Sequence, residues 1–118
     1  MKETKGLSKI EVVTTLSNLS NLTNELCKKG ITGVTVSQVL GCGVQNGAFE
    51  YEEKNDTFSL LPKQLVWMVV EDSILDDTIE CIKKILYTGH IGDGKIFVTP
   101  VTNVVRVRTG DEGFDALR

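Results

Sequence analysis

The stretch Leu65-Val66-Trp67-Met68-Val69-Val70 decides the fold of this chain, because every side chain in it is apolar. A strand points successive side chains to opposite faces, so the run predicts a central strand, over residues 60–70, that is covered on both sides. One layer of helices covers only one face of a sheet. The other face therefore needs another partner, and a second copy of the chain is the most economical one.

Two strands and one helix are predicted before this stretch. β-Branched residues dominate residues 9–15, which favours a strand. Over residues 18–29 the apolar side chains recur with a helical period, and Gly30 is a natural stop for that helix. Residues 33–40 are rich in alternating valines and predict a second strand.

After the central strand, a second helix is predicted to open at Asp72 or Ser73 and to close near residues 88–89. Residues 95–101 follow as a strand, and residues 104–107 are expected to form a short fifth one. The order β-α-β-β-α-β is the ferredoxin-like pattern of the α+β class. A chain of 118 residues suffices for one such domain and not for two.

Residues 41–59 have no sustained period and predict a long exposed loop. Loops of this length inside a compact domain usually carry function. Three aromatic residues lie in it, and the sequence leaves open whether they pack the loop onto the body or contact a partner: Phe49, Tyr51 and Phe58.

Composition narrows the function classes. A net charge of −3 argues against nucleic acid as a partner, because proteins that bind phosphate backbones usually carry a basic field. No apolar run approaches the ~20 residues of a membrane-spanning helix, and the polar start lacks the apolar core of a secretion signal. We therefore expect a cytoplasmic protein without direct membrane insertion.

The cysteines and the single histidine give little support to catalysis. Cys27, Cys42 and Cys81 are widely spaced, which favours small apolar packing residues in a reducing compartment over disulfides or a zinc site. A redox role of Cys42 is the alternative. His90 is expected to be exposed in a glycine-flanked loop, with no nucleophile placed beside it.

The turn Gly92-Asp93-Gly94 followed by Lys95 has the residues of a phosphate cradle. Glycines let backbone N–H groups approach an anion, and a lysine adds a positive charge. By itself this sequence is also an ordinary turn. Arg106 and Arg108 lie two positions apart, so in an extended segment both would point the same way, either toward one polyphosphate or toward water at a sheet edge.

Five segments, in order and over most of residues 9–110, resemble the PII signal-transduction family. They match the family's first helix-to-strand connection, T-loop entry, T-loop exit, glycine turn and C-terminal loop. They are Gly30-Ile31-Thr32-Gly33-Val34-Thr35-Val36, Gly41-Cys42-Gly43-Val44-Gln45-Asn46-Gly47, Leu61-Pro62-Lys63, Thr88-Gly89-His90-Ile91-Gly92-Asp93-Gly94-Lys95-Ile96-Phe97-Val98 and Val105-Arg106-Val107-Arg108-Thr109-Gly110.

The resemblance implies a single PII-like domain over residues 1–118 with four functional segments. The family's assembly is a homotrimer with nucleotide clefts between subunits, and its T-loop regulates a target transporter or metabolic enzyme. Such a protein is a sensor and not an enzyme. The expected segments are a flexible N-terminus at 1–8, the T-loop at 44–59, a phosphate-binding turn at 88–95 and a C-terminal loop and tail at 102–118.

The resemblance also implies which residues bind ATP or ADP. The adenine side is lined by side chains and by the backbone of residues 41–43, while the glycine turn, its lysine and the arginines of a neighbouring subunit bind the phosphates. The full set is Val13, Thr35, Gly41, Cys42, Gly43, Val69, Gly92, Asp93, Gly94, Lys95, Arg106 and Arg108.

Two further ligands are implied by matching positions. Gln45 matches the residue that helps to hold Mg²⁺ together with ATP and 2-oxoglutarate. Gly47 and Lys63 belong to the same 2-oxoglutarate set, in which the lysine pairs with a carboxylate. Mg²⁺ would come with the nucleotide, mostly through phosphate oxygens.

The chain departs from the family near this site. Val44 replaces the usual arginine, whose contact with phosphate is worth ~1.5–3 kcal/mol. Asn46 and the stretch Thr14-Thr15-Leu16 also lack the usual basic residues, so binding of 2-oxoglutarate stays open. Residues 55–59 contain no tyrosine, so uridylylation is not expected.

Two other functions remain as alternatives. The first is a PII-like module that binds a different small ligand without nucleotide sensing, which Val44 favours. The second is a small ferredoxin-like enzyme acting on a phosphorylated substrate. The acidic character of residues 50–56 suggests that the target differs from the usual one.

Overall fold

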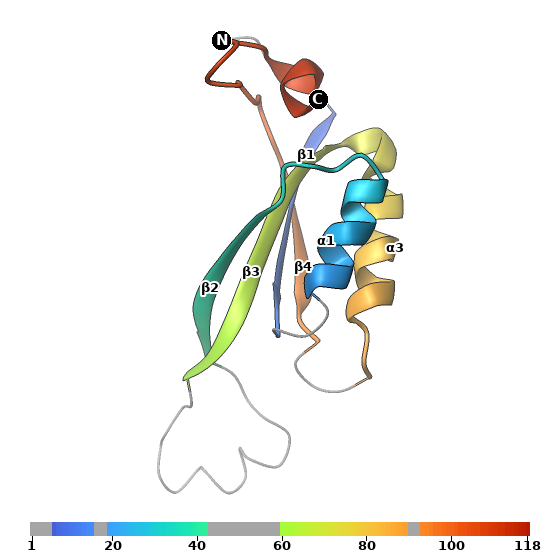
Figure 1. The fold of residues 1–118 in the computed structure, drawn as a ribbon, viewed down its shortest axis with the longest axis vertical. Coiled ribbons are helices and arrows are strands. Elements are labelled where there is room, and N and C mark those ends of the chain that lie inside the picture. Colours follow the sequence, from blue (N-terminus) through green and yellow to red (C-terminus); the bar gives the residue numbers. More distant parts are fainter. Residues whose placement is uncertain (1–5, 16–18, 43–59, 90–92) are drawn as a thin grey trace, which may run out of the picture.

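A four-stranded antiparallel sheet carries two helices on one of its faces (Figure 1). The computed structural model describes residues 6–15, 19–42, 60–89 and 93–118. The strands lie in the order β2-β3-β1-β4. This arrangement confirms the predicted α+β class and the β-α-β-β-α-β order. The elements are β1 (Leu7–Thr14), α1 (Leu19–Lys28), β2 (Thr35–Cys42), β3 (Leu60–Glu71), the 3₁₀ turn η1 (Asp72–Ile74), α3 (Leu75–Leu86), β4 (Lys95–Pro100) and the 3₁₀ turn η2 (Gly113–Leu117).

The predicted central strand is β3, which pairs with β2 on one side and β1 on the other. Its side chains alternate as a strand requires. Val66, Met68 and Val70 are buried against the helices, whereas Trp67 and Val69 are only half-buried on the opposite face. We call that opposite side the open face of the sheet. Among the described residues, helices therefore cover only one face of the apolar run.

The core lies between the sheet and the helices. Thr78 of α3 is fully buried there, and its hydroxyl donates to the carbonyl of Ile74 at 2.7 Å, which ties η1 to the helix. The apolar core residues come from β1, α1, β3 and α3 and from the turn after α1: Ile10, Val12, Leu22, Leu26, Ile31, Val66, Met68, Val70, Ile82 and Leu86.

The predicted stop at Gly30 is confirmed. Gly30 has φ = +87°, which a residue without a Cβ adopts without strain. Its N–H donates to Cys27 O at 2.9 Å, and the N–H of Ile31 donates to Leu26 O at 3.0 Å. These two bonds close the end of α1. They turn residues 30–34 back toward the start of β2, where a groove of the candidate site forms.

Several predicted boundaries were wrong. β1 begins at Leu7, so Leu7 and Ser8 are buried strand residues and not part of a flexible segment at 1–8. The Ser8 hydroxyl donates to Asp72 Oδ1 at 2.5 Å, and the Asp72 N–H donates to Gly6 O at 2.7 Å. These contacts hold Asp72 against β1, so the chain makes a 3₁₀ turn first and α3 starts at Leu75.

The ends of two other predicted elements also change. β2 runs from Thr35 to Cys42, and Gly41 and Cys42 pair with Leu61 and Leu60, so neither lies in the loop predicted over 41–59. The fifth strand predicted over 104–107 is not formed. Val105 makes one isolated bridge with Glu112, and a turn follows it. The remainder of the predicted loop, including the T-loop at 44–59 and its aromatic residues, lies outside the described residues.

Candidate functional site

The described candidate residues divide between two ends of the sheet. At one end, Val13 pairs with Lys95. At the other end, β4 stops at Pro100, opposite Ser8, and leads into the segment that carries Arg106. Five strand residues separate these ends, which corresponds to about 17 Å. We call the first the turn end and the second the C-terminal end of the sheet.

An open groove of about 640 Å³ lies at the C-terminal end. The connection after α1, the strands β2 and β3 and the C-terminal segment enclose it. A groove of this size can hold a small ligand. Thr35, Val69 and Arg106 are the predicted site residues that line it. The complete lining is Lys29, Gly30, Ile31, Thr32, Gly33, Val34, Thr35, Trp67, Val69, Val70, Glu71, Ile74, Val104, Arg106, Ala116, Leu117 and Arg118.

Trp67 is a groove residue that the sequence did not single out as part of the site. It pairs directly with Thr35 across the β2–β3 ladder, so both side chains stand on the open face. Lys9 Nζ lies 4.5 Å from the centroid of the indole ring and 3.8 Å from Glu11 Oε2. The alternation of β3 already placed Trp67 on the same face as Val69, and that was the available signal.

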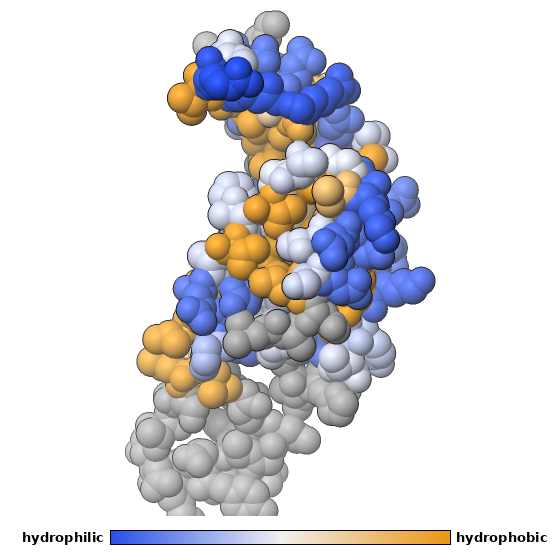
Figure 2. Space-filling view, viewed as in Figure 1, coloured by the Kyte–Doolittle hydropathy of each residue, from blue (hydrophilic) through white to orange (hydrophobic). Residues whose placement is uncertain are grey.

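Hydrophobic residues gather between the C-terminal segment at the top of Figure 2 and the polar outer surface of the helices. Outward-facing lysines and acidic residues of α1 and α3 form i,i+3 ion pairs there, such as Lys83 with Glu80 at 3.2 Å. The apolar surface near the groove and the charged surface of the helix layer are thus separate regions. This division suits a helix layer that faces water and a sheet region that meets a partner.

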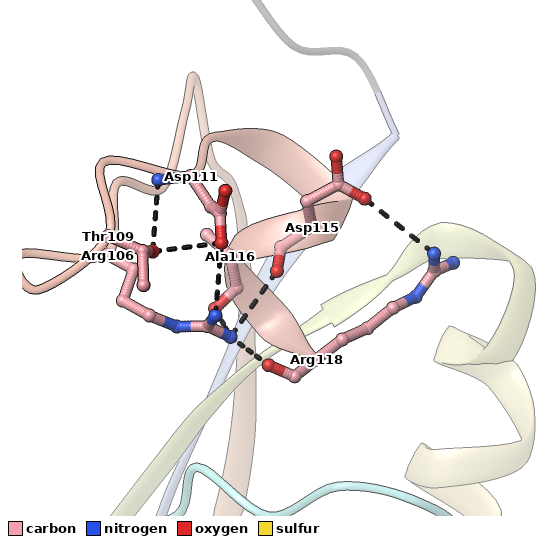
Figure 3. Close-up of polar contacts among 6 residues, drawn as sticks. All are labelled: Arg106, Thr109, Asp111, Asp115, Ala116 and Arg118. Atoms are coloured by element: carbon pink, nitrogen blue, oxygen red, sulfur yellow. Dashed lines mark hydrogen bonds and ion pairs between the residues drawn. The ribbon is translucent and has the colours of Figure 1, made fainter.

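Arg106 is engaged by its own chain (Figure 3). Its Nη1 lies 3.2 Å from Asp111 Oδ2, and its Nη2 donates to the carbonyls of Asp115 at 3.3 Å and Ala116 at 3.2 Å, and also to that of Arg118. These carbonyls belong to the end of η2, where a cation is favourable. The guanidinium therefore closes the C-terminal turn.

The expected convergence of Arg106 and Arg108 in an extended segment was wrong for this conformation. The Gly110 N–H donates to Arg106 O at 2.8 Å, and the Arg106 N–H donates to Asp111 O at 2.9 Å, so the backbone turns between the two arginines. Gly110 has φ = +77°, which permits the turn. Arg108 is exposed and does not line the groove.

At the turn end, Gly94 lies directly against β1. Its φ is +101°, and a Cβ built on it would lie 2.2 Å from Val13 O. Asp93 points its carboxylate into its own loop, where Oδ2 accepts from the N–H groups of Thr88 at 2.8 Å and Gly89 at 3.1 Å. Its carbonyl accepts from the Thr14 hydroxyl at 3.1 Å. Asp93 and Gly94 therefore shape the turn that precedes Lys95.

Lys63 also lies close to Gly41, on the open face, where β2 and β3 extend beyond the end of β1. A Cβ at Gly41 would lie 2.8 Å from Lys63 Cδ, so the lysine stem passes over the glycine. Lys63 is half-buried, whereas Lys95 is exposed. Four of the candidate residues, Gly43, Gln45, Gly47 and Gly92, and also His90 lie outside the described residues.

Two searches of the described ranges bear on metals and membranes. Within residues 6–15, 19–42, 60–89 and 93–118, no group of three or more His, Cys, Asp or Glu side chains could hold a metal ion. In the same ranges, no helix is long and apolar enough to cross a membrane.

Comparisons with known proteins agree on one family. The model of the family "Nitrogen regulatory protein P-II" matches residues 7–111. A curated protein of that name from Azospirillum brasilense is 43% identical over 112 residues, covering 94% of this chain and 100% of the relative. Another from Cyanidium caldarium is 40% identical and covers 93% of this chain and 98% of the relative.

Solved structures agree as well. A GlnK–ATP complex from B. subtilis superposes with a TM-score of 0.79 at 38% identity, covering 94% of this chain and 97% of that one. PII from Arabidopsis thaliana bound to citrate gives a TM-score of 0.78 at 33% identity, covering 97% and 92%.

Proposed function

Because this chain belongs to the nitrogen regulatory protein P-II family, we propose that it is a regulatory protein that binds ATP and ADP in clefts between copies of itself. The solved GlnK relative is described in complex with ATP, which supports an adenine nucleotide as the ligand. ATP and ADP compete for one site, so the protein reports the energy state of the cytoplasm.

The division of the candidate residues between the two sheet ends carries this proposal. Val13, Gly94 and Lys95 lie at the turn end, beside β1 and β4, whereas the groove that contains Thr35 and Arg106 is lined by β2 and β3 and extends toward the C-terminal end. One nucleotide contacts both sets most readily if the groove of one copy faces the turn end of another. A closed ring of three copies provides three such clefts, and it covers the open face of each sheet.

The phosphates lie against the backbone of residues 92–94 in this arrangement, with Lys95 beside them. Gly94 supports this role, because its missing Cβ lets the turn pack closely on β1 and keeps Lys95 at the head of β4. Mg²⁺ accompanies the nucleotide and is held by phosphate oxygens with Gln45. 2-Oxoglutarate would act through Gln45, Gly47 and Lys63. Val44, which replaces the usual arginine, weakens the case for 2-oxoglutarate binding.

The regulatory output passes through residues 44–59. This segment joins β2 to β3, whose ladder extends to the pair Cys42–Leu60. A nucleotide that contacts Gln45 favours one arrangement of the segment over another only by its difference in affinity for the two. The favoured arrangement docks on a target protein, a transporter or a metabolic enzyme, and recruitment to a membrane transporter would be indirect.

Calorimetric titration with ATP and ADP, each with Mg²⁺ and with or without 2-oxoglutarate, tests the proposal. ATP binding that strengthens with 2-oxoglutarate indicates a carbon and nitrogen sensor. Binding that is indifferent to 2-oxoglutarate indicates an energy sensor. No heat with either nucleotide, confirmed by equilibrium dialysis, overturns the proposal and selects a module for a different ligand. Nucleotide turnover by the purified protein would favour an enzyme instead.

A further inference from the structure

We propose that Trp67 is the wall against which the base of the bound nucleotide stacks, so that this residue sets a preference for purines over pyrimidines. The inference rests on the proposed nucleotide function and adds to it a residue that selects the base. It starts from the position of the indole in the groove. Trp67 is not among the predicted adenine contacts.

The strand register places Trp67 between two predicted adenine contacts. Thr35 is its direct partner on β2, and Val69 lies two positions further along β3 on the same face. All three line the groove. An indole flanked by a threonine and a valine forms a flat wall, and a flat wall is what the face of a heteroaromatic base requires.

Lys9 defines which face of the indole is available. Its ammonium lies over the ring at 4.5 Å from the centroid, on the side of β1, and Glu11 holds it from the same strand. Lys9 itself does not line the groove. One face of the ring is therefore occupied by a cation, so a base in the groove would stack on the face away from Lys9.

The rest of the groove suits the other parts of a nucleotide. The connection after α1 contributes the peptide groups of residues 30–33, which can bond to the polar edge of a base. The lining contains Arg106, Arg118 and Lys29 against one acidic residue, Glu71, which pairs with Arg118 at 3.4 Å, so it carries an excess of positive charge where an anionic tail would lie. A stacking wall, peptide groups and cations together fit a nucleotide better than they fit an apolar peptide side chain.

Because a purine has a larger face than a pyrimidine, the wall favours ATP and GTP over CTP. Stacking of a base on an aromatic side chain is lost on substitution, with a weakening of about tenfold or more. We expect Trp67→Leu to weaken ATP binding by about that factor and to leave CTP binding nearly unchanged, while Trp67→Phe keeps most of the preference.

The test uses the full chain and two readouts. Calorimetry with ATP, GTP and CTP compares the wild type with Trp67→Leu and Trp67→Phe. Tyr87→Leu is the control, because Tyr87 is an exposed aromatic residue at the end of α3, away from the open face, and does not line the groove. Light scattering checks the assembly of each variant. Trp67 is the single tryptophan of the chain, so the intrinsic fluorescence of the wild type reports on this residue alone.

Each outcome decides the matter. A collapse of the ATP-to-CTP ratio in Trp67→Leu but not in Tyr87→Leu supports the stacking role. Unchanged ratios overturn it while leaving the nucleotide function intact. If Trp67→Leu does not assemble, wild-type emission decides: a change that saturates with ATP at the calorimetric midpoint supports the role, and constant emission overturns it. If the wild type binds no nucleotide, both proposals fail.

Discussion

Arg106 and Asp111 form an ion pair across the C-terminal turn, with 3.2 Å between Nη1 and Oδ2. The same guanidinium also closes the end of η2 through main-chain carbonyls (Figure 3). A side chain that holds its own C-terminal segment in this way must exchange those partners before it can bind a phosphate.

The first prediction concerns this competition. Asp111→Ala removes one acceptor from Arg106, and a partly exposed pair of this kind contributes up to ~1 kcal/mol. We expect ATP affinity to rise up to about fivefold, measured by calorimetry, with little change in stability. Glu80→Ala, which breaks an exposed ion pair with Lys83, is the control and should leave binding unchanged. A weaker affinity in Asp111→Ala would show that the pair prepares Arg106 for the ligand instead of withholding it.

The second prediction concerns the close packing at Gly94. An alanine there combines φ = +101° with a Cβ at 2.2 Å from Val13 O. We expect Gly94→Ala to lower the free energy of unfolding by about 2 kcal/mol or more. Urea denaturation measures it, with Gly33→Ala as the control, because a Cβ at Gly33 meets nothing within 4 Å. Equal stabilities of the two variants would contradict the packing argument.

The third prediction concerns Asp93, whose carboxylate organises the turn. Asp93→Ala removes the acceptor of the Thr88 and Gly89 amides, so hydrogen exchange at these two amides should accelerate by tenfold or more, an estimate of about 1.4 kcal/mol of lost local stability. ATP affinity should fall as well, because the backbone that we propose to bind phosphate loses its preorganised shape. Asp76→Ala, at an exposed position in the first turn of α3, is the control. Unchanged exchange rates would mean that the turn keeps its shape without the carboxylate.

The fourth prediction concerns the open face of the sheet. Phe97 is 51% exposed there, so a charge at this position stays hydrated in an isolated chain but is buried if another copy covers the face. We expect Phe97→Asp to reduce the mass measured by light scattering from that of a trimer to that of a monomer, with unchanged helical circular dichroism. Tyr87→Asp, at the exposed end of α3, should stay trimeric. A trimeric Phe97→Asp would exclude this part of the face from the interface.

The fold could be predicted from periodicity because local patterns and tertiary packing agree in this chain. Val66, Met68 and Val70 alternate with Trp67 and Val69, and burial follows that alternation. Gly30 ends α1 for a reason that is local to the backbone. The boundaries at Leu7, Cys42 and Leu75 were missed, because contacts such as Ser8 to Asp72 join residues 64 positions apart.

For the candidate site, the residue types could be predicted but not their partners. Arg106 was expected in an extended segment, yet a turn at Gly110 and the carbonyls of η2 direct it elsewhere. Asp93 was expected to contact a ligand through its backbone. The structure adds that its carboxylate accepts hydrogen bonds from the N–H groups of Thr88 and Gly89 in the same loop. Trp67 was noted only as an apolar strand residue, because its exposure to a groove depends on the C-terminal segment folding back against β3.

The class of the fold, the order of its elements and the family could all be inferred from the amino-acid sequence alone. These properties depend on the spacing of apolar side chains and on ordered motifs, which lie along the chain. Which candidate residues lie close together became known only from the folded arrangement of the strands. Strand pairing places Val13 beside Lys95 and Thr35 beside Trp67, and the strand order puts the first pair in one half of the sheet and the second pair in the other half. Proximity of this kind is set by register and closure, which no local segment contains.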